Sequence, residues 1–148
     1  MIRATHARYV LDASVAAKWF TRHEETDRHK AVALRALHQS GQCTLVVPEF
    51  SLLEIVNAIR FSERAEETDA SGALRLLELL RLDIVSLDWE LLRKATAIAW
   101  AYRIALYDAA YVALAERQGF PLLTADEVMV QRMKGHSAVV RLAELEFS

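Results

Sequence analysis

The feature that most limits the possible folds is a regular alternation of short apolar runs with longer helical patterns. The apolar runs are brief, and several are rich in Val and Ile, as expected of strands in a buried sheet. Strands that alternate with helices predict a parallel sheet with helices on both faces. The five predicted strands are residues 9–11, 44–47, 84–87, 121–124 and 138–142.

Helical patterns with recognisable ends fill the intervals between these strands. Ser14 is expected to cap the first helix, because its hydroxyl can accept from a free backbone N–H, and Asp88 is expected to cap another. The segment 108–118 is apolar almost all round, which predicts burial between layers or partners. The expected helices are residues 15–20, 24–40, 49–64, 69–82, a stretch after 88, and 108–118.

Length and composition predict a single globular domain spanning residues 1–148, in which residues 1–7 form a short leader. The chain has 148 residues, enough to bury a sizeable core, and 53% of them are hydrophobic. Residues 1–7 are too polar for a signal-peptide core, and charges break the apolar runs well before 18 residues, so no membrane span is expected. Cys43 is the single cysteine, and a cytoplasmic setting is the simplest interpretation.

Four acidic residues lie directly against apolar segments, where an ordinary solvent-exposed carboxylate is not expected. Asp12 ends the first predicted strand, Glu54 interrupts an apolar helix, Asp108 opens another, and Asp126 follows the fourth strand. In a parallel sheet, sites form beyond the carboxyl ends of the strands, and all four acids can reach that edge. Because ionised carboxylates are costly to bury unless they are paired or bind a cation, the pattern predicts one shared cation site.

Two of the acids also have an ordinary structural explanation. Asp12 could be a turn residue or a cap for the next helix, although Ser14 already supplies a cap. Glu54 could form a buried polar pair with Asn57, one helical turn away, or an ion pair with an arginine.

The other two acids are open to similar alternatives. Asp108 could be a helix N-cap, because Asp is a preferred residue at that position. Asp126 could be a turn residue, and its neighbour Glu127 competes with it for a role in metal binding. Thr124 offers a hydroxyl that could hold a carboxylate or a metal-bound water, or could simply end its strand.

The chemistry of the four acids favours a hard cation and a phosphate substrate. Mg²⁺ and Mn²⁺ take oxygen ligands, and the five histidines of the chain have no zinc-binding spacing. The net charge of −2 argues weakly against a general nucleic-acid coat. If the four acids belong to a metal site, however, 20 − 4 = 16 acids face 18 bases, so an RNA substrate is not excluded.

Taken together, these residues resemble the PIN-domain ribonucleases, and most closely the VapC toxins of prokaryotic toxin–antitoxin pairs. The resemblance runs from about Arg8 to Leu142, and it lies in the order and spacing of several short pieces rather than in any single one. The matching pieces are VLDASV at 10–15, KWF at 18–20, PE at 48–49, EIVNAI at 54–59, YDAAYVALA at 107–115 and LLTAD at 122–126.

The resemblance implies a three-layer α/β/α PIN-like fold with a central five-stranded parallel sheet in the order 3-2-1-4-5. It implies Mg²⁺- or Mn²⁺-dependent cleavage of RNA, a homodimer, and a VapB-like antitoxin whose tail lies in the acidic groove. By position, the family's acidic quartet of catalytic and metal-binding residues corresponds to Asp12, Glu54, Asp108 and Asp126. Its supporting polar positions correspond to Ser14, Asn57 and Thr124.

Three other interpretations remain at this stage. A haloacid-dehalogenase-type phosphatase also has an Asp after its first strand but requires a second two residues later, where this chain has Ser14. A phospho-receiver domain needs a further Asp ending its third strand, and Asp88 is expected there only as a helix cap. A non-catalytic PIN-like binding or assembly module would keep the acids without cleaving RNA.

Overall fold

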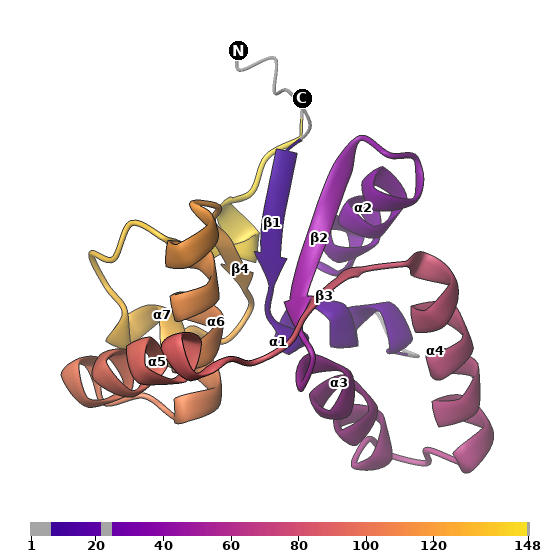
Figure 1. The fold of residues 1–148 in the computed structure, drawn as a ribbon. Coiled ribbons are helices and arrows are strands. Elements are labelled where there is room, and N and C mark those ends of the chain that lie inside the picture. The colour runs from indigo at the N-terminus through magenta and orange to yellow at the C-terminus, as the bar shows by residue number, and fades with distance from the viewer. Residues whose placement is uncertain (1–6, 22–24, 148) are drawn as a thin grey trace.

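The computed structural model of the protein describes residues 7–21 and 25–147, and its centre is a five-stranded parallel sheet (Figure 1). The strand order is β3-β2-β1-β4-β5, which confirms the predicted fold and order. All five predicted strands are present, with ends shifted by at most two residues. They are β1 (Ala7–Leu11), β2 (Cys43–Pro48), β3 (Asp83–Val85), β4 (Leu122–Thr124) and β5 (Val139–Arg141).

The order of the strands places a topological switch point between β1 and β4. The chain proceeds outward from β1 through β2 to β3, and then returns to add β4 and β5 on the other side of β1. Val10 pairs with Val46 of β2 and with Leu122 of β4, so β1 lies at the centre of the sheet. In open parallel sheets, ligands bind in the crevice outside the carboxyl ends of the strands at such a point.

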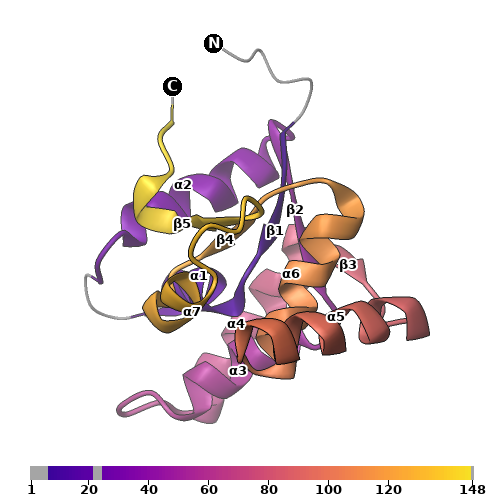
Figure 2. The ribbon, with the colours of Figure 1, turned by 90° about the vertical axis from the view of Figure 1, so that its left-hand side faces the viewer.

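Helices cover both faces of this sheet, and Figure 2 shows α2 and α6 on opposite sides of β1 and β2. On one face, α6 lies between the strands and α5, and α3 and α4 pack on each other (Figure 1). The helices are α1 (Ala13–Ala16), η1 (Ala17–Phe20), α2 (Arg28–Gln39), α3 (Ser51–Arg60), α4 (Glu67–Leu80), α5 (Trp89–Tyr102), α6 (Leu106–Gln118), α7 (Glu127–Arg132) and η2 (Leu142–Glu144).

The core follows from the composition of these elements. The middle strands have fully buried residues such as Val10, Leu45 and Leu123. Residues 109–115 of α6 are all buried, because the helix is sandwiched between the sheet and α5, and this confirms the predicted burial of the segment. None of the helices in the described ranges is long and apolar enough to span a bilayer.

Three expectations about local structure need correction, and one is confirmed. Ser14 does not cap a helix, since α1 begins at Ala13 and Ser14 lies inside it. Asp108 is not an N-cap either, because α6 begins two residues earlier and Asp108 is its third residue. The predicted leader lies outside the described residues except for Ala7, which already belongs to β1. Asp88 does cap α5, accepting from the backbone N–H of Leu91 at 2.7 Å.

Candidate active site

Asp12 leaves the carboxyl end of β1 and is held by two hydroxyl groups. Its side chain is only 5% exposed, and its Oδ2 accepts a hydrogen bond of 2.9 Å from Thr124 Oγ1 and a short one from Ser14 Oγ. Burial raises the pKa of Asp12, and the two hydroxyl donors partly offset that effect. A buried carboxylate whose partners are neutral keeps its negative charge uncompensated.

The same two hydroxyls connect the start of α1 to the loop that follows β4. Ser14 Oγ accepts from the backbone N–H of Ala125 at 3.0 Å, and Thr124 Oγ1 accepts from that of Asp126 at 3.1 Å. Each hydroxyl therefore donates to Asp12 and accepts from the neighbouring loop. Thr124 contacts a carboxylate, which is one of the roles open to its hydroxyl, and Ser14 contacts Asp12 and the loop after β4 in place of the expected capping role.

Glu54 lies in the first turn of α3, and its partner is a tyrosine from another helix. The hydroxyl of Tyr111 donates to Glu54 Oε1 at 2.9 Å. Burial raises the pKa of Glu54, the Tyr111 hydrogen bond opposes this, and the charge of Asp12 adds to the increase. This electrostatic effect of Asp12 indicates that the two carboxylates share one region of the molecule.

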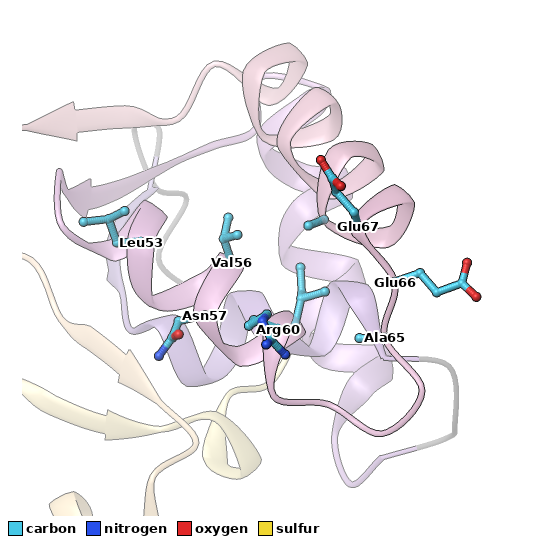
Figure 3. Close-up of a pocket in the computed structure, with 9 residues that line it drawn as sticks. Leu53, Val56, Asn57, Arg60, Ala65, Glu66 and Glu67 are labelled. Atoms are coloured by element: carbon cyan, nitrogen blue, oxygen red, sulfur yellow. The ribbon is translucent and has the colours of Figure 1, made fainter.

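The alternative in which Glu54 forms a buried polar pair with Asn57 is not what the structure shows, because Glu54 bonds Tyr111 instead. The side chain of Asn57 is exposed and hydrogen-bonds none of the described residues. It borders a pocket of about 580 Å³ between α3 and the start of α4 (Figure 3), together with Leu53, Arg60 and Glu67. Asn57 therefore does not join the four acids through any contact of this structure.

Asp108 is the acid with the most perturbed ionisation. It lies half-buried in the first turn of α6, and its carboxylate accepts no hydrogen bond from the described residues. Burial first, and then the charges of Asp12, Asp126 and Glu54, raise its pKa to about 6. Since three carboxylates from three other elements act on this one group, the sequence-predicted acids lie in one electrostatic site.

Asp126 caps α7, whereas the adjacent Glu127 forms an ion pair. Its Oδ1 accepts from the backbone N–H groups of Val128 at 3.0 Å and Met129 at 3.2 Å. Glu127 instead forms an ion pair of 3.0 Å with Arg141, and its side chain is 64% exposed. Asp126 raises the pKa values of both Asp12 and Asp108, whereas Glu127 affects neither. This geometry favours Asp126 as the fourth acid.

The four acids have no cationic partner among the described residues, whereas several other carboxylates do. None of them forms an ion pair with a lysine or arginine in the part of the chain that the structure describes. By contrast, Asp83 pairs with Arg8, Asp88 with Arg117 and Glu116 with Lys94. Four acids that share one field without a neutralising cation form a site that favours positive charge.

The donor set suits a hard divalent cation, although the carboxylates are not drawn together around a point. All four side chains offer oxygen ligands of the kind that Mg²⁺ and Mn²⁺ prefer. Among residues 7–21 and 25–147, no three His, Cys, Asp or Glu side chains lie close enough together to hold a metal ion as they stand. Carboxylates in one region repel one another, and an ion bound between them would offset that repulsion.

Tyr111 is the residue of this site that the sequence interpretation missed. Its side chain is fully buried, and its hydroxyl lies 2.9 Å from Glu54 Oε1, 2.8 Å from Ser51 Oγ and 3.3 Å from the backbone N of Ala13. A tyrosine within an apolar helix usually needs a partner for its hydroxyl. That was the signal available in the sequence, since Tyr111 follows Asp108 by a single helical turn.

Comparison with known proteins gives consistent matches along most of the chain. Residues 9–134 match the PIN domain. The chain is 32% identical to Ribonuclease VapC3 from Pyrobaculum aerophilum over 129 residues, which cover 84% of this chain and 94% of that protein.

Two solved structures share the fold at low sequence identity. A toxin–antitoxin complex from Klebsiella pneumoniae matches with a TM-score of 0.68 and 16% identity, covering 93% of this chain and 99% of that one. VapC20 from Mycobacterium tuberculosis is a toxin that cleaves the sarcin–ricin loop. It matches with a TM-score of 0.60 and 17% identity, covering 83% of this chain and 93% of that one.

Proposed function

The chain belongs to the PIN-domain family, and on that premise we propose that it is a metal-dependent endoribonuclease of the VapC toxin type. The observation that carries the proposal is geometric: Ser14 and Thr124 hold the buried Asp12, and Tyr111 holds Glu54. None of the four acids has a lysine or arginine partner among the described residues. The named relative, Ribonuclease VapC3, supports RNA as the substrate class. The catalytic and metal-binding acids are Asp12, Glu54, Asp108 and Asp126.

The cation would be Mg²⁺ or Mn²⁺, held by the four carboxylates. When bound, such an ion neutralises the scissile phosphate and lowers the pKa of a coordinated water. Asp12 is anchored for this role by Ser14 and Thr124, and Glu54 is anchored by Tyr111. These hydrogen bonds leave a second carboxylate oxygen of Asp12 and of Glu54 available for an ion.

Asp108 is the acid best suited to accept a proton. Asp126 already accepts from two backbone N–H groups, whereas the carboxylate of Asp108 has no hydrogen bond from the described residues. A general base must be free to receive the proton of the attacking water and to hold it as the P–O bond breaks. We assign this role to one carboxylate oxygen of Asp108, and the other oxygen would remain for the ion. As the water oxygen bonds to the phosphorus of the RNA backbone, the bond from phosphorus to the leaving ribose oxygen breaks, and that oxygen takes a proton from solvent.

Partners are proposed by the same reasoning. The Klebsiella pneumoniae neighbour is a toxin–antitoxin complex, which supports a VapB-like antitoxin as the partner of this chain. We also propose that the chain itself forms a homodimer. A surplus of four uncompensated carboxylates is complementary to a basic side chain of such an antitoxin. Light scattering on the purified chain tests the dimer, and a monomer at micromolar concentration would contradict it.

A cleavage assay tests the function directly. Wild-type protein with Mg²⁺ or Mn²⁺ should cut an unstructured RNA or an RNA loop, and EDTA should stop it. Asp12→Asn should lower the rate by at least about 100-fold, because it removes charge while keeping the shape of the side chain. Asp83→Asn is the matched control, since Asp83 pairs with Arg8 and belongs to no shared acidic field.

Two outcomes would overturn the proposal. In one, RNA of every kind stays intact with either ion, which would favour a non-catalytic binding or assembly module. In the other, Asp12→Asn cuts RNA as fast as the wild type, which would separate the acids from the chemistry. A haloacid-dehalogenase-type phosphatase would instead release phosphate from small phosphoesters, and that assay uses the same two proteins.

A further inference from the structure

A single phenol oxygen connects three of the elements that carry the acids. The hydroxyl of Tyr111 lies 2.9 Å from Glu54 Oε1 on α3 and 2.8 Å from Ser51 Oγ, one turn earlier on the same helix. The backbone N–H of Ala13, the first residue of α1, donates to it at 3.3 Å. Tyr111 itself belongs to α6, which also carries Asp108.

The hydrogen-bonding capacity of this oxygen matches its three partners. A phenol has one proton to donate, and an ionised carboxylate can only accept, so the proton belongs to Glu54. The lone pairs of the phenol oxygen then accept from the Ala13 N–H and from the Ser51 hydroxyl. Every polar group in this buried cluster is therefore satisfied, and turning the Tyr111 ring away would leave several of them unpaired.

The contact with Ala13 explains how α1 begins without a side-chain cap. The first N–H groups of a helix have no partner inside the helix. Asp12, at the N-cap position, makes no side-chain capping bond, because its carboxylate is engaged by Ser14 and Thr124. The Tyr111 hydroxyl accepts a hydrogen bond from one of those N–H groups, that of Ala13, and so it fixes the backbone immediately after Asp12.

The ring of Tyr111 is held as firmly as its hydroxyl. The ring is fully buried and packs edge-to-face on Phe50, with centroids 5.3 Å apart and an interplanar angle of 78°. Phe50 directly precedes α3 and also packs on Tyr107 of α6 at 5.4 Å. The helix that carries Glu54 is thus docked on the helix that carries Asp108 by aromatic contacts, and the hydroxyl lies at that junction.

We propose that Tyr111 is a positioning residue, whose hydroxyl orients the carboxylate of Glu54 for cation binding and anchors it beside the start of α1. The proposal rests on the proposed function, because it assumes that the acids bind a divalent ion. Hydrogen-bond partners of metal-binding side chains typically change metal affinity or activity by about 10- to 100-fold when removed. Tyr111 acts through Glu54 and touches no reacting atom.

Metal binding by the RNA-free protein tests the proposal without relying on activity. Tyr111→Phe keeps the packed ring and deletes only the hydroxyl, and it should weaken Mn²⁺ binding in calorimetric titration by about tenfold or more. Tyr102→Phe is the matched control, because the Tyr102 ring packs on His136 and its hydroxyl contacts none of the four acids. Tyr102→Phe should bind Mn²⁺ like the wild type.

A double-mutant comparison separates positioning from a general contribution to stability. If Tyr111 acts through Glu54, then Tyr111→Phe should change Mn²⁺ affinity by no more than about twofold in a Glu54→Gln background. A purely structural role would lower affinity equally in both backgrounds. The proposal is overturned if the two effects multiply, or if Tyr111→Phe binds Mn²⁺ as tightly as the wild type.

A second measurement leaves the hydroxyl in place and applies even if Tyr111→Phe does not fold. With 3-fluorotyrosine introduced at position 111, the ¹⁹F resonance should shift on addition of Mg²⁺, and Glu54→Gln should abolish the shift. A resonance that does not respond to Mg²⁺ would overturn the proposal. If the wild type binds neither ion, the metal-dependent function fails and the positioning role fails with it. If wild type and Tyr111→Phe bind equally, only the positioning role fails.

Discussion

Thr124 and Asp12 are 112 positions apart in the sequence, and Thr124 Oγ1 donates to Asp12 Oδ2 across 2.9 Å. Both side chains are buried; Thr124 is the last residue of β4, and Asp12 directly follows the adjacent strand β1. The contact links β4 to β1 at the topological switch point of the sheet, where the order of the strands reverses. It also lets a carboxylate remain in a buried position without a cationic neighbour.

Removing this hydroxyl should destabilise the fold. Thr124→Val keeps the shape but leaves Asp12 one donor short and deprives the backbone N–H of Asp126 of its acceptor. We expect a loss of about 1–3 kcal/mol in the free energy of unfolding, measured by urea denaturation. Thr124→Ser keeps the hydroxyl and should lose less. Equal stability of wild type and Thr124→Val would contradict the role of this contact.

Asp108 should make the metal-free protein less stable as pH rises. Its pKa is about 6 in the folded protein and near 3.9 in the unfolded chain, so the folded state binds the proton more tightly. Stability is therefore highest below about pH 4 with respect to this group, and it declines as pH rises through 6. The full shift corresponds to about 3 kcal/mol, which solvent screening of a half-exposed group reduces to about 1–2.

Asp108→Asn should remove that dependence. In EDTA at pH 7.5 the variant should unfold with a free energy about 1–2 kcal/mol higher than that of the wild type, and the two should converge at pH 4. Urea denaturation at both pH values measures the difference. A variant that is less stable than the wild type at pH 7.5 would show that Asp108 is compensated by a partner.

Divalent cations should stabilise the wild-type protein at neutral pH. An ion that binds only the folded state adds about 2.7 kcal/mol at a concentration 100 times its Kd, and it also relieves the repulsion among the acids. Thermal unfolding with and without Mn²⁺ should therefore show a clear rise in Tm, which Asp12→Asn reduces. An unchanged Tm in the wild type at millimolar Mn²⁺ would count against the cation site.

The sequence was sufficient for the sheet because each strand is a short apolar run bounded by helical patterns. It was less informative about helix starts, where the hydrogen-bond partner of a polar side chain depends on tertiary contacts. Ser14 has the residue type of a cap, yet its hydroxyl bonds the carboxylate two positions earlier and the loop after β4. That choice depends on β4 lying beside β1, which no local pattern around Ser14 reveals.

Contacts between elements explain the remaining differences at the site. Helical spacing places Asn57 one turn from Glu54, but Tyr111 reaches Glu54 from a helix 57 positions away in sequence. The apolar character of α6 predicts that Tyr111 is buried, while the identity of its partners depends on how α3 docks on α6. The electrostatic effect of Asp12, Glu54 and Asp126 on Asp108 agrees with the expectation that the four acids reach one edge of the sheet.

Asp126 and Glu127 are adjacent at the start of α7, and substituting each one tests which is the fourth acid of the site. Asn caps a helix about as well as Asp, so Asp126→Asn should keep α7 folded while removing a charge that acts on Asp12 and Asp108. We expect single-turnover cleavage of an unstructured RNA with Mn²⁺ to slow by about 10- to 100-fold. Glu127→Gln should stay within about twofold of wild type, because its exposed ion pair with Arg141 contributes little. If Glu127→Gln is the slower enzyme, the fourth acid has been assigned to the wrong neighbour, and the acidic site must include the start of α7 on its solvent-exposed side.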